Sequence, residues 1–206
     1  VVEAATGAPA VWQADAHCSI GATTSYGLMV FRDDEVQHKG EINYKHIHAG
    51  KPYCRVASTD CTKHPEWIRN MLVTEWDLDP PRILLSVTGG AMSFDLPPKL
   101  DEMIKIGLQK AAKTESLWIT SGGTNSGVMQ YVGEAVNGGT DTKSDCPVIA
   151  IATWSIIHNK ERLETHPDGQ PMQGGLAYYG RTTEQTPSLA LDQNHTHYIL
   201  VDDGTK

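Results

Sequence analysis

The sequence has little positive charge, few aromatic side chains and no long apolar run. Its 206 residues include 17 Lys and Arg against 25 Asp and Glu, which gives a formal net charge of −8. This balance argues against a nucleic-acid-binding surface, which needs clustered Lys and Arg. No apolar stretch approaches the roughly 20 residues of a membrane-spanning helix, and no secretory signal is visible. We therefore expect a segment that neither spans a membrane nor binds nucleic acid.

Cysteine pairs and metal-ligand motifs are also missing. The four cysteines are Cys18, Cys54, Cys61 and Cys146. They form no CxxC pair and do not match zinc-binding spacings. We interpret them as reduced thiols of a cytosolic protein, although their spacing does not exclude a disulfide. His46 and His48 would share one face of a strand, but no third ligand accompanies them. The sequence therefore predicts no metal site.

A strand, a Gly-Gly turn and a helix occur twice in succession between residues 81 and 135. The strands are short apolar runs at 82–87 and 117–120, as expected for strands covered on both faces of a parallel sheet. Apolar residues spaced three and four apart predict the helices at 100–112 and 128–136. Two such units in tandem indicate parallel strands joined by right-handed crossovers.

Other segments complete the expected sheet. Further strands are predicted at 26–31, 42–48, 51–57, 147–153 and 197–201, and helices at 62–76 and 155–164. Residues 166–175 are rich in turn formers. No helix follows the last strand, and a parallel sheet normally has both faces covered. We therefore expect the domain to be incomplete at its C-terminal end.

The two Gly-Gly turns form the candidate binding site. In a parallel sheet, both turns should lie at the carboxyl edge, where ligands bind. Free backbone N–H groups, nearby hydroxyls and the positive end of the following helix suit phosphate oxygens. The hydroxyl residues are Thr88, Ser93, Ser121, Thr124 and Ser126. These could be merely tight turns, but two hydroxyl-flanked turns in register favour a nucleotide or another phosphate-bearing ligand.

Four further residues have two interpretations each. Trp154, at the carboxyl end of a strand, could stack on a base or cap the core. Asp203 could accept a ribose hydroxyl or cap a helix. Arg181 could clamp a diphosphate or be a solvated loop residue. Glu134 could act as a general acid or base, but a solvated or helix-pairing glutamate is the simpler interpretation.

The segments LLSVTGGAMSF, LWITSGGTNSGVMQYVGEAV, IAIATW and LDQNHTHYILVDDGT resemble the N-terminal homology region of melastatin-type transient receptor potential channels. That region belongs to the SLOG superfamily of Rossmann-like nucleotide-binding domains. The resemblance extends from about Trp67 to Thr205 and is strongest to the ADP-ribose-gated members. It implies an α/β fold, a Rossmann-like parallel sheet flanked by helices. Residues 1–43 would then be an irregular arm with edge strands, and 44–206 the first part of a nucleotide-binding domain.

The resemblance also implies a function. It implies a cytosolic sensing domain of a homotetrameric, Ca²⁺-permeable cation channel of the plasma membrane. The expected ligand is ADP-ribose or a related nucleotide, and Ca²⁺ would be required elsewhere in the channel. By motif, the ligand-binding residues are Thr88, Gly89, Gly90, Ala91, Ser93, Gly122, Gly123, Thr124, Ser126, Tyr178 and Arg181. Met92 and Ser93 stand where the family often has Lys and Asn, which removes an amide. No catalytic residue is implied, and we expect part of the cleft to lie beyond this chain.

Two alternatives stay open. A nucleotide phosphoribohydrolase of the same superfamily would carry a Pro-Gly-Gly-x-Gly-Thr turn followed by a catalytic Glu, and this chain has neither in that arrangement. A degenerate domain would only make subunit contacts in the tetramer, and Met92 and Ser93 favour it slightly. Saturable nucleotide binding separates the sensor from the degenerate domain, and product formation separates the sensor from the enzyme.

Overall fold

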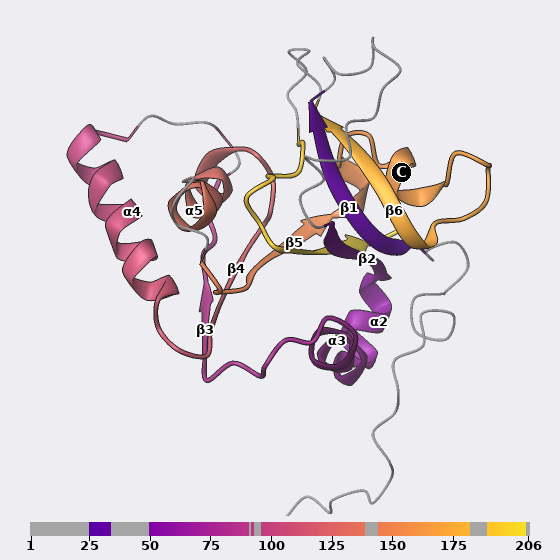
Figure 1. Cartoon of the computed structure of the whole chain (residues 1–206), viewed down its shortest axis with the longest axis horizontal. Coiled ribbons are helices and arrows are strands. Elements are labelled where there is room, and N and C mark those ends of the chain that lie inside the picture. Colours follow the sequence, from indigo (N-terminus) through magenta and orange to yellow (C-terminus); the bar gives the residue numbers. More distant parts are fainter. Residues whose placement is uncertain are drawn as a thin grey trace, which may run out of the picture.

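A computed structural model shows one mixed sheet with helices on both faces (Figure 1). The structure describes residues 25–33, 50–90, 92, 96–138, 144–181 and 189–204. The predicted strand at 42–48, with His46 and His48, lies outside these residues, as does most of the predicted arm. Within the described part of the chain, no helix has the length and apolar character needed to cross a membrane.

Seven strands lie in the order β3-β4-β5-β7-β2-β1-β6. Their bounds are Tyr26–Asp33 (β1), Lys51–Ala57 (β2), Ile83–Ser86 (β3), Leu117–Ser121 (β4), Val148–Thr153 (β5), Gln173–Arg181 (β6) and His197–Asp202 (β7). Neighbours from β3 to β2 are parallel, whereas β1 is antiparallel to β2 and parallel to β6. The expected α/β class and parallel sheet are confirmed, and the long β1–β6 pair forms one edge (Figure 1).

The helices lie on both faces of the sheet, between the strands that precede and follow them in the chain. Their bounds are Ser58–Lys63 (α2), Pro65–Asn70 (α3), Met71–Glu75 (η3, a π-helical turn), Pro98–Ala112 (α4), Gly127–Asn137 (α5), Trp154–Ile156 (η4) and Glu161–Glu164 (α6). Helices α4 and α5 link β3 to β4 and β4 to β5, whereas α2, α3 and η3 lie between β2 and β3. The single helix predicted at 62–76 is wrong, because Pro65 keeps His64 out of the helical conformation.

Strand β4 shows why the apolar runs are continuous. Trp118 packs with Met71 of η3 on one face of the sheet. Leu117 and Ile119 pack with Val132 of α5 on the other face. Every residue of β4 is therefore buried, as expected for a central strand of a parallel sheet.

The sheet is staggered at its carboxyl edge, and the stagger positions the candidate site. Ser121, the last residue of β4, pairs with Ala150 in the middle of β5. Strand β5 continues to Thr153, which is about 10 Å farther at the usual rise per residue. The chain that leaves β4 consequently turns over the face of β5.

Candidate functional site

The first Gly-Gly turn follows β3 and lies against the start of α5. Thr88, Gly89 and Gly90 are exposed. A side chain at Gly89 would collide with Val128 of α5, because a Cβ placed there would lie 2.5 Å from Val128 Cγ2. The Val128 N–H points to the Gly90 carbonyl oxygen at 3.5 Å. The two Gly-Gly turns are thus linked through the first turn of α5, while Ala91 and Ser93 lie outside the described residues.

The second turn passes directly over β5. Gly123 has a φ of 69°, and a Cβ placed there would overlap the Cβ of Ala150. Both the backbone conformation and the close approach therefore require glycine. Gly122 is less constrained, since a Cβ there would meet only the flexible Met129 side chain, at 3.3 Å.

The hydroxyls that follow the second turn face inward. Thr124 and Ser126 are both buried, and their hydroxyl oxygens are hydrogen-bonded to each other at 3.1 Å. The polar groups that the turns leave free are instead backbone donors. Among the described residues of the two turns, the N–H groups of Gly89, Gly90 and Gly122 donate to no acceptor.

Tyr178 is not brought to the turns, but its neighbour Tyr179 is. The Tyr179 hydroxyl oxygen accepts the Leu191 N–H at 3.1 Å, and Leu191 pairs with Thr124 beside the second turn. Because successive side chains of a strand point to opposite faces, Tyr178 points away from this contact. Arg181 ends β6, and its side chain lies outside the described residues.

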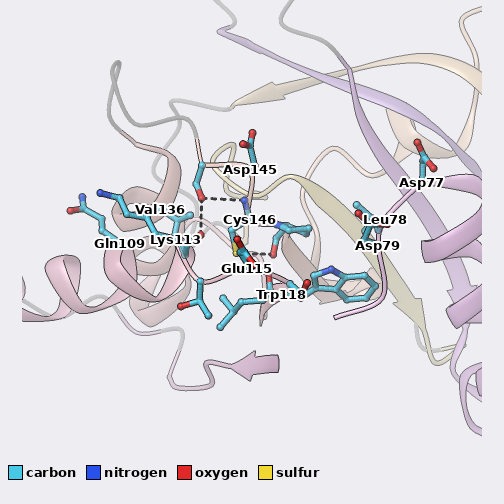
Figure 2. A pocket seen from close by; sticks show the side chains of 16 residues that line it. Asp77, Leu78, Asp79, Gln109, Lys113, Glu115, Trp118, Val136, Asp145 and Cys146 are labelled. Carbon is cyan, nitrogen blue, oxygen red and sulfur yellow. Dashed lines mark hydrogen bonds between the residues drawn. The ribbon is translucent and has the colours of Figure 1, made fainter. Parts of the chain in front are cut away.

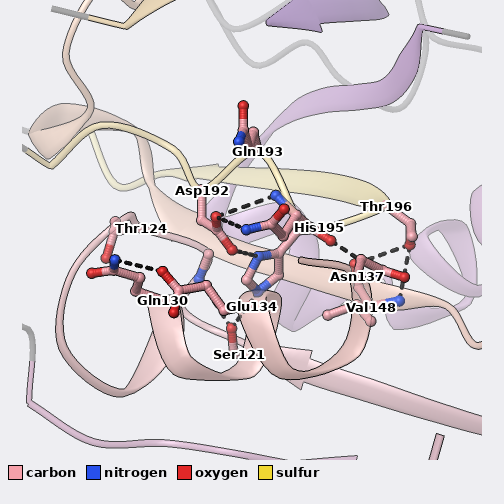
Figure 3. Close-up of polar contacts among 12 residues, drawn as sticks. Ser121, Thr124, Gln130, Glu134, Asn137, Val148, Asp192, Gln193, His195 and Thr196 are labelled. Carbon is pink, nitrogen blue, oxygen red and sulfur yellow. Dashed lines mark hydrogen bonds and ion pairs between the residues drawn. The ribbon is translucent and has the colours of Figure 1, made fainter. Parts of the chain in front are cut away.

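A buried chain of three polar side chains lies beneath the second turn (Figure 3); it includes Ser121, which was expected to face a phosphate, and two residues that the sequence analysis did not single out. Ser121 Oγ lies 2.6 Å from His195 Nε2, and His195 Nδ1 lies 2.8 Å from Asp192 Oδ2. His195 is 0% exposed and Asp192 is 1% exposed. The only sequence signal was the spacing of Asp192 and His195 in LDQNHTH, which does not identify the serine 74 residues away.

Helix α5 and strand β7 pack tightly around this chain. A Cβ at Gly133 of α5 would overlap Asp192 Oδ2, so that the helix backbone rests directly on the carboxylate. The Tyr198 hydroxyl donates toward the carbonyl oxygens of Asp192 (2.6 Å) and His195 (3.1 Å). Burial raises the pKa of Tyr198 well above its usual range, which keeps this hydroxyl protonated as a donor. The loop before β7 is consequently rigidly held.

A second polar cluster lies at the carboxyl ends of β2 and β7. Arg55 Nη2 and Nε lie 2.6 and 3.0 Å from Asp202 Oδ2, and Arg55 Nη1 lies 2.7 Å from Glu164 Oε1. The guanidinium also stacks 4.2 Å from the ring centre of Trp154. Trp154 is 3% exposed and belongs to the core, which favours the core-capping interpretation of this residue over base stacking.

Glu134 is hydrogen-bonded to a residue on its own helix. Gln130 Nε2 donates to Glu134 Oε1 at 2.8 Å, one turn away on α5. This contact fits the simpler interpretation of Glu134 rather than acid or base chemistry. Among the described residues, no group of three His, Cys, Asp or Glu side chains is arranged to hold a metal ion.

A cavity of about 720 Å³ lies at the opposite, amino-terminal edge of β4 (Figure 2). Leu117 and Trp118 line it together with acidic side chains such as Glu115 and Asp145. Burial raises the pKa of Cys146 there to about 11, and its thiol donates to the Leu117 carbonyl at 3.2 Å. The cavity is therefore separate from the Gly-Gly turns, and its thiol stays protonated at neutral pH.

Comparison with known proteins places these features in a family. Residues 51–206 match the family model described as SLOG in TRPM. The chain is 42% identical over 175 residues to "Transient receptor potential cation channel subfamily M member-like 2" of Nematostella vectensis, covering 81% of the chain and 11% of that protein. It is 38% identical over 201 residues to subfamily M member 2 of Mus musculus, covering 94% of the chain and 12% of that protein. Subfamily M member 1 of Mus musculus is 32% identical over 195 residues, with 94% and 11% covered. The chain thus spans about a tenth of the length of these curated relatives.

Proposed function

The chain belongs to the family of SLOG domains of subfamily M transient receptor potential cation channels, and from this premise we propose that it is the ligand-sensing domain of such a channel. The proposed ligand is ADP-ribose or a related nucleotide. We further propose a cytosolic location, in a homotetrameric, Ca²⁺-permeable channel of the plasma membrane, with Ca²⁺ required outside this domain.

The observation that carries the proposal is the meeting of the two Gly-Gly turns at the start of α5. Among the described residues there, the N–H groups of Gly89, Gly90 and Gly122 donate to no acceptor. An anionic group gains from such donors and from the positive end of a helix. The diphosphate of ADP-ribose would accept hydrogen bonds from these groups, despite the net negative charge of the chain.

Ligand binding would act on the channel by shifting a conformational equilibrium. A ligand favours whichever state binds it more tightly, by the difference in affinity between the two states. For a sensor, this requires no nucleophile or general base. We propose accordingly that the chain is not an enzyme. The burial of His195 and the pairing of Glu134 on α5 support this part of the proposal.

Calorimetric titration of ADP-ribose into the chain tests the proposal, with AMP and cyclic ADP-ribose titrated in parallel. Gly90→Val is the informative variant, because a Cβ at Gly90 would meet nothing nearer than the Met92 nitrogen at 4.0 Å. The matched control is Gly107→Val on α4, where a Cβ meets nothing within 4 Å. We expect saturable binding of ADP-ribose that Gly90→Val abolishes and Gly107→Val leaves unchanged.

Two results would count against the proposal. If a folded sample gives no heat with any of the three ligands, the sensing role is wrong and a domain that only makes subunit contacts is the better account. If Gly90→Val binds as well as the wild type, the ligand lies elsewhere. Chromatography of the titrated nucleotide checks the non-enzymatic part, which product formation would overturn.

A further inference from the structure

Ser121, His195 and Asp192 form a continuous buried chain of hydrogen bonds. A carboxylate only accepts hydrogen bonds, so His195 Nδ1 carries the hydrogen that meets Asp192 Oδ2. His195 Nε2 lies at hydrogen-bonding distance, 2.6 Å, from the Ser121 hydroxyl oxygen. The Ser121 oxygen in turn accepts the Gly123 N–H at 3.3 Å. The imidazole therefore links the carboxylate to the backbone of the second Gly-Gly turn.

The same turn is held from its other side by the loop at 189–196. The Gly123 carbonyl accepts the Asp192 N–H at 2.9 Å, and the Asn125 N–H donates to the Ala190 carbonyl at 2.7 Å. The loop itself is anchored by the Lys51 ammonium, which contacts the carbonyl oxygens of Gln193 and His195. The turn and the loop consequently form one hydrogen-bonded unit.

We propose that His195 is a positioning residue, which holds the second Gly-Gly turn in its ligand-binding shape through Ser121. This inference rests on the proposed function. With the Gly123 N–H engaged by Ser121, Gly122 is the glycine of the second turn whose N–H donates to no acceptor among the described residues. Its direction is set by the turn, and the turn is set by the chain from Asp192. Binding of a phosphate group is thereby coupled to the loop that leads into β7.

The arrangement has the same residue types and contact order as the Ser-His-Asp relay of hydrolases. Such a relay acts only when the serine oxygen can reach a substrate carbonyl. Here the imidazole is fully buried, the serine oxygen already accepts a backbone N–H, and α5 covers the carboxylate. The geometry thus fits a chain of residues that supports the turn. It offers a substrate no access to the serine oxygen.

Two substitutions distinguish a positioning role of these residues from a catalytic one. Ser121→Ala removes the acceptor of the Gly123 N–H, and we expect ADP-ribose to bind the full 206-residue chain about tenfold more weakly, the loss of roughly one hydrogen bond. Asp192→Asn keeps the shape and the chain of contacts, because its amide can donate to Nδ1 while Nε2–H donates to the Ser121 oxygen. We therefore expect Asp192→Asn to weaken ADP-ribose binding much less than Ser121→Ala does.

Matched controls separate positioning from a general loss of stability. Ser86→Ala makes the same change at the end of the neighbouring strand β3, where the serine is exposed. Leu163→Ala removes a fully buried side chain of α6. Both should bind ADP-ribose like the wild type at a temperature where they are folded. A readout without ligand is the Gly123 amide signal in ¹H–¹⁵N spectra, which we expect to move upfield and exchange faster in Ser121→Ala but not in Asp192→Asn.

The outcomes keep this inference distinct from the proposed function. If the wild type binds ADP-ribose and Ser121→Ala binds equally well, the positioning role is wrong while the sensing role stands. If the wild type shows no saturable binding, the sensing role fails and the positioning role fails with it. Hydrolysis of p-nitrophenyl acetate that is lost in both Ser121→Ala and Asp192→Asn would instead make the three residues catalytic and overturn the inference.

Discussion

Removing the charge of Arg55 should destabilise the fold more than any surface substitution. Arg55→Met keeps a similar length and apolar stem but leaves the Asp202 carboxylate, whose side chain is 5% exposed, without its cation. Within the described part of the chain, the one hydrogen-bond donor left to Asp202 would be the Gly204 N–H, at 2.8 Å. Glu164 adds little to the loss, because its side chain is 46% exposed and water can replace the guanidinium.

The magnitude follows from the burial of the pair. Removing one partner of a buried ion pair costs about 3–5 kcal/mol, out of a net stability of roughly 5–15 kcal/mol for a domain. With a urea m value of about 2 kcal/mol per molar, the unfolding midpoint of Arg55→Met should fall by about 2 M. Tryptophan fluorescence can follow unfolding, because Trp154 stacks on the substituted residue.

A second substitution tests the cause of this loss. Asp202→Asn in the Arg55→Met background removes the uncompensated charge, so the double variant should be more stable than Arg55→Met alone. The cycle of the two single variants and the double variant isolates the interaction of the pair. A loss below about 1 kcal/mol for Arg55→Met, the range of exposed pairs, would refute the reasoning.

Two further perturbations act on single residues. Burial, and to a lesser extent the Lys51 charge, lowers the pKa of His197 from 6.5 to about 4. The contribution of His197 to the free energy of unfolding should therefore be fully present above pH 6.5. It should fall by about 3 kcal/mol as the pH drops toward 4. Urea midpoints measured across this window should show the fall in the wild type, and much less of it in His197→Gln. Gly123→Ala should cost about 2–4 kcal/mol, from the overlap with Ala150 and the left-handed backbone, whereas Gly122→Ala should stay near the wild type in the same denaturation assay.

The parallel core could be predicted because its signals are local. Strands β3, β4, β5 and β7 are short apolar runs, and α4 and α5 have apolar stripes at helical spacing. Strand β6 was not predicted, and its first residues were interpreted as a turn. Gly174 and Gly175 have φ values of 85° and 89°, and they lie where the register of β6 against the distant β1 shifts.

The sequence predicts the turns of the site but not the buried residues that hold the second turn. The apolar runs of the sequence locate the ends of β3 and β4, and the Gly-Gly turns directly follow these ends. The turns are therefore expected at the carboxyl edge of the parallel sheet. The contact between Ser121 and His195 joins residues 74 apart, and no local pattern specifies it. Tyr178 and Tyr179 show a different limit, because a shift of one residue along a strand changes the face of the sheet.

The glycines of the two turns are not all required for the same reason. Only a glycine that the fold itself does not require can be attributed to ligand binding. Gly123 is required by its left-handed backbone and by the close approach to Ala150, and Gly89 by its contact with Val128. These two would be glycine even in a domain that binds nothing. Gly90 has neither constraint: its φ is not in the left-handed range, and a Cβ would find open space. A bulky residue at Gly90 therefore changes what can approach the turn and leaves the turn itself intact, so its effect on ADP-ribose affinity measures the ligand contact alone.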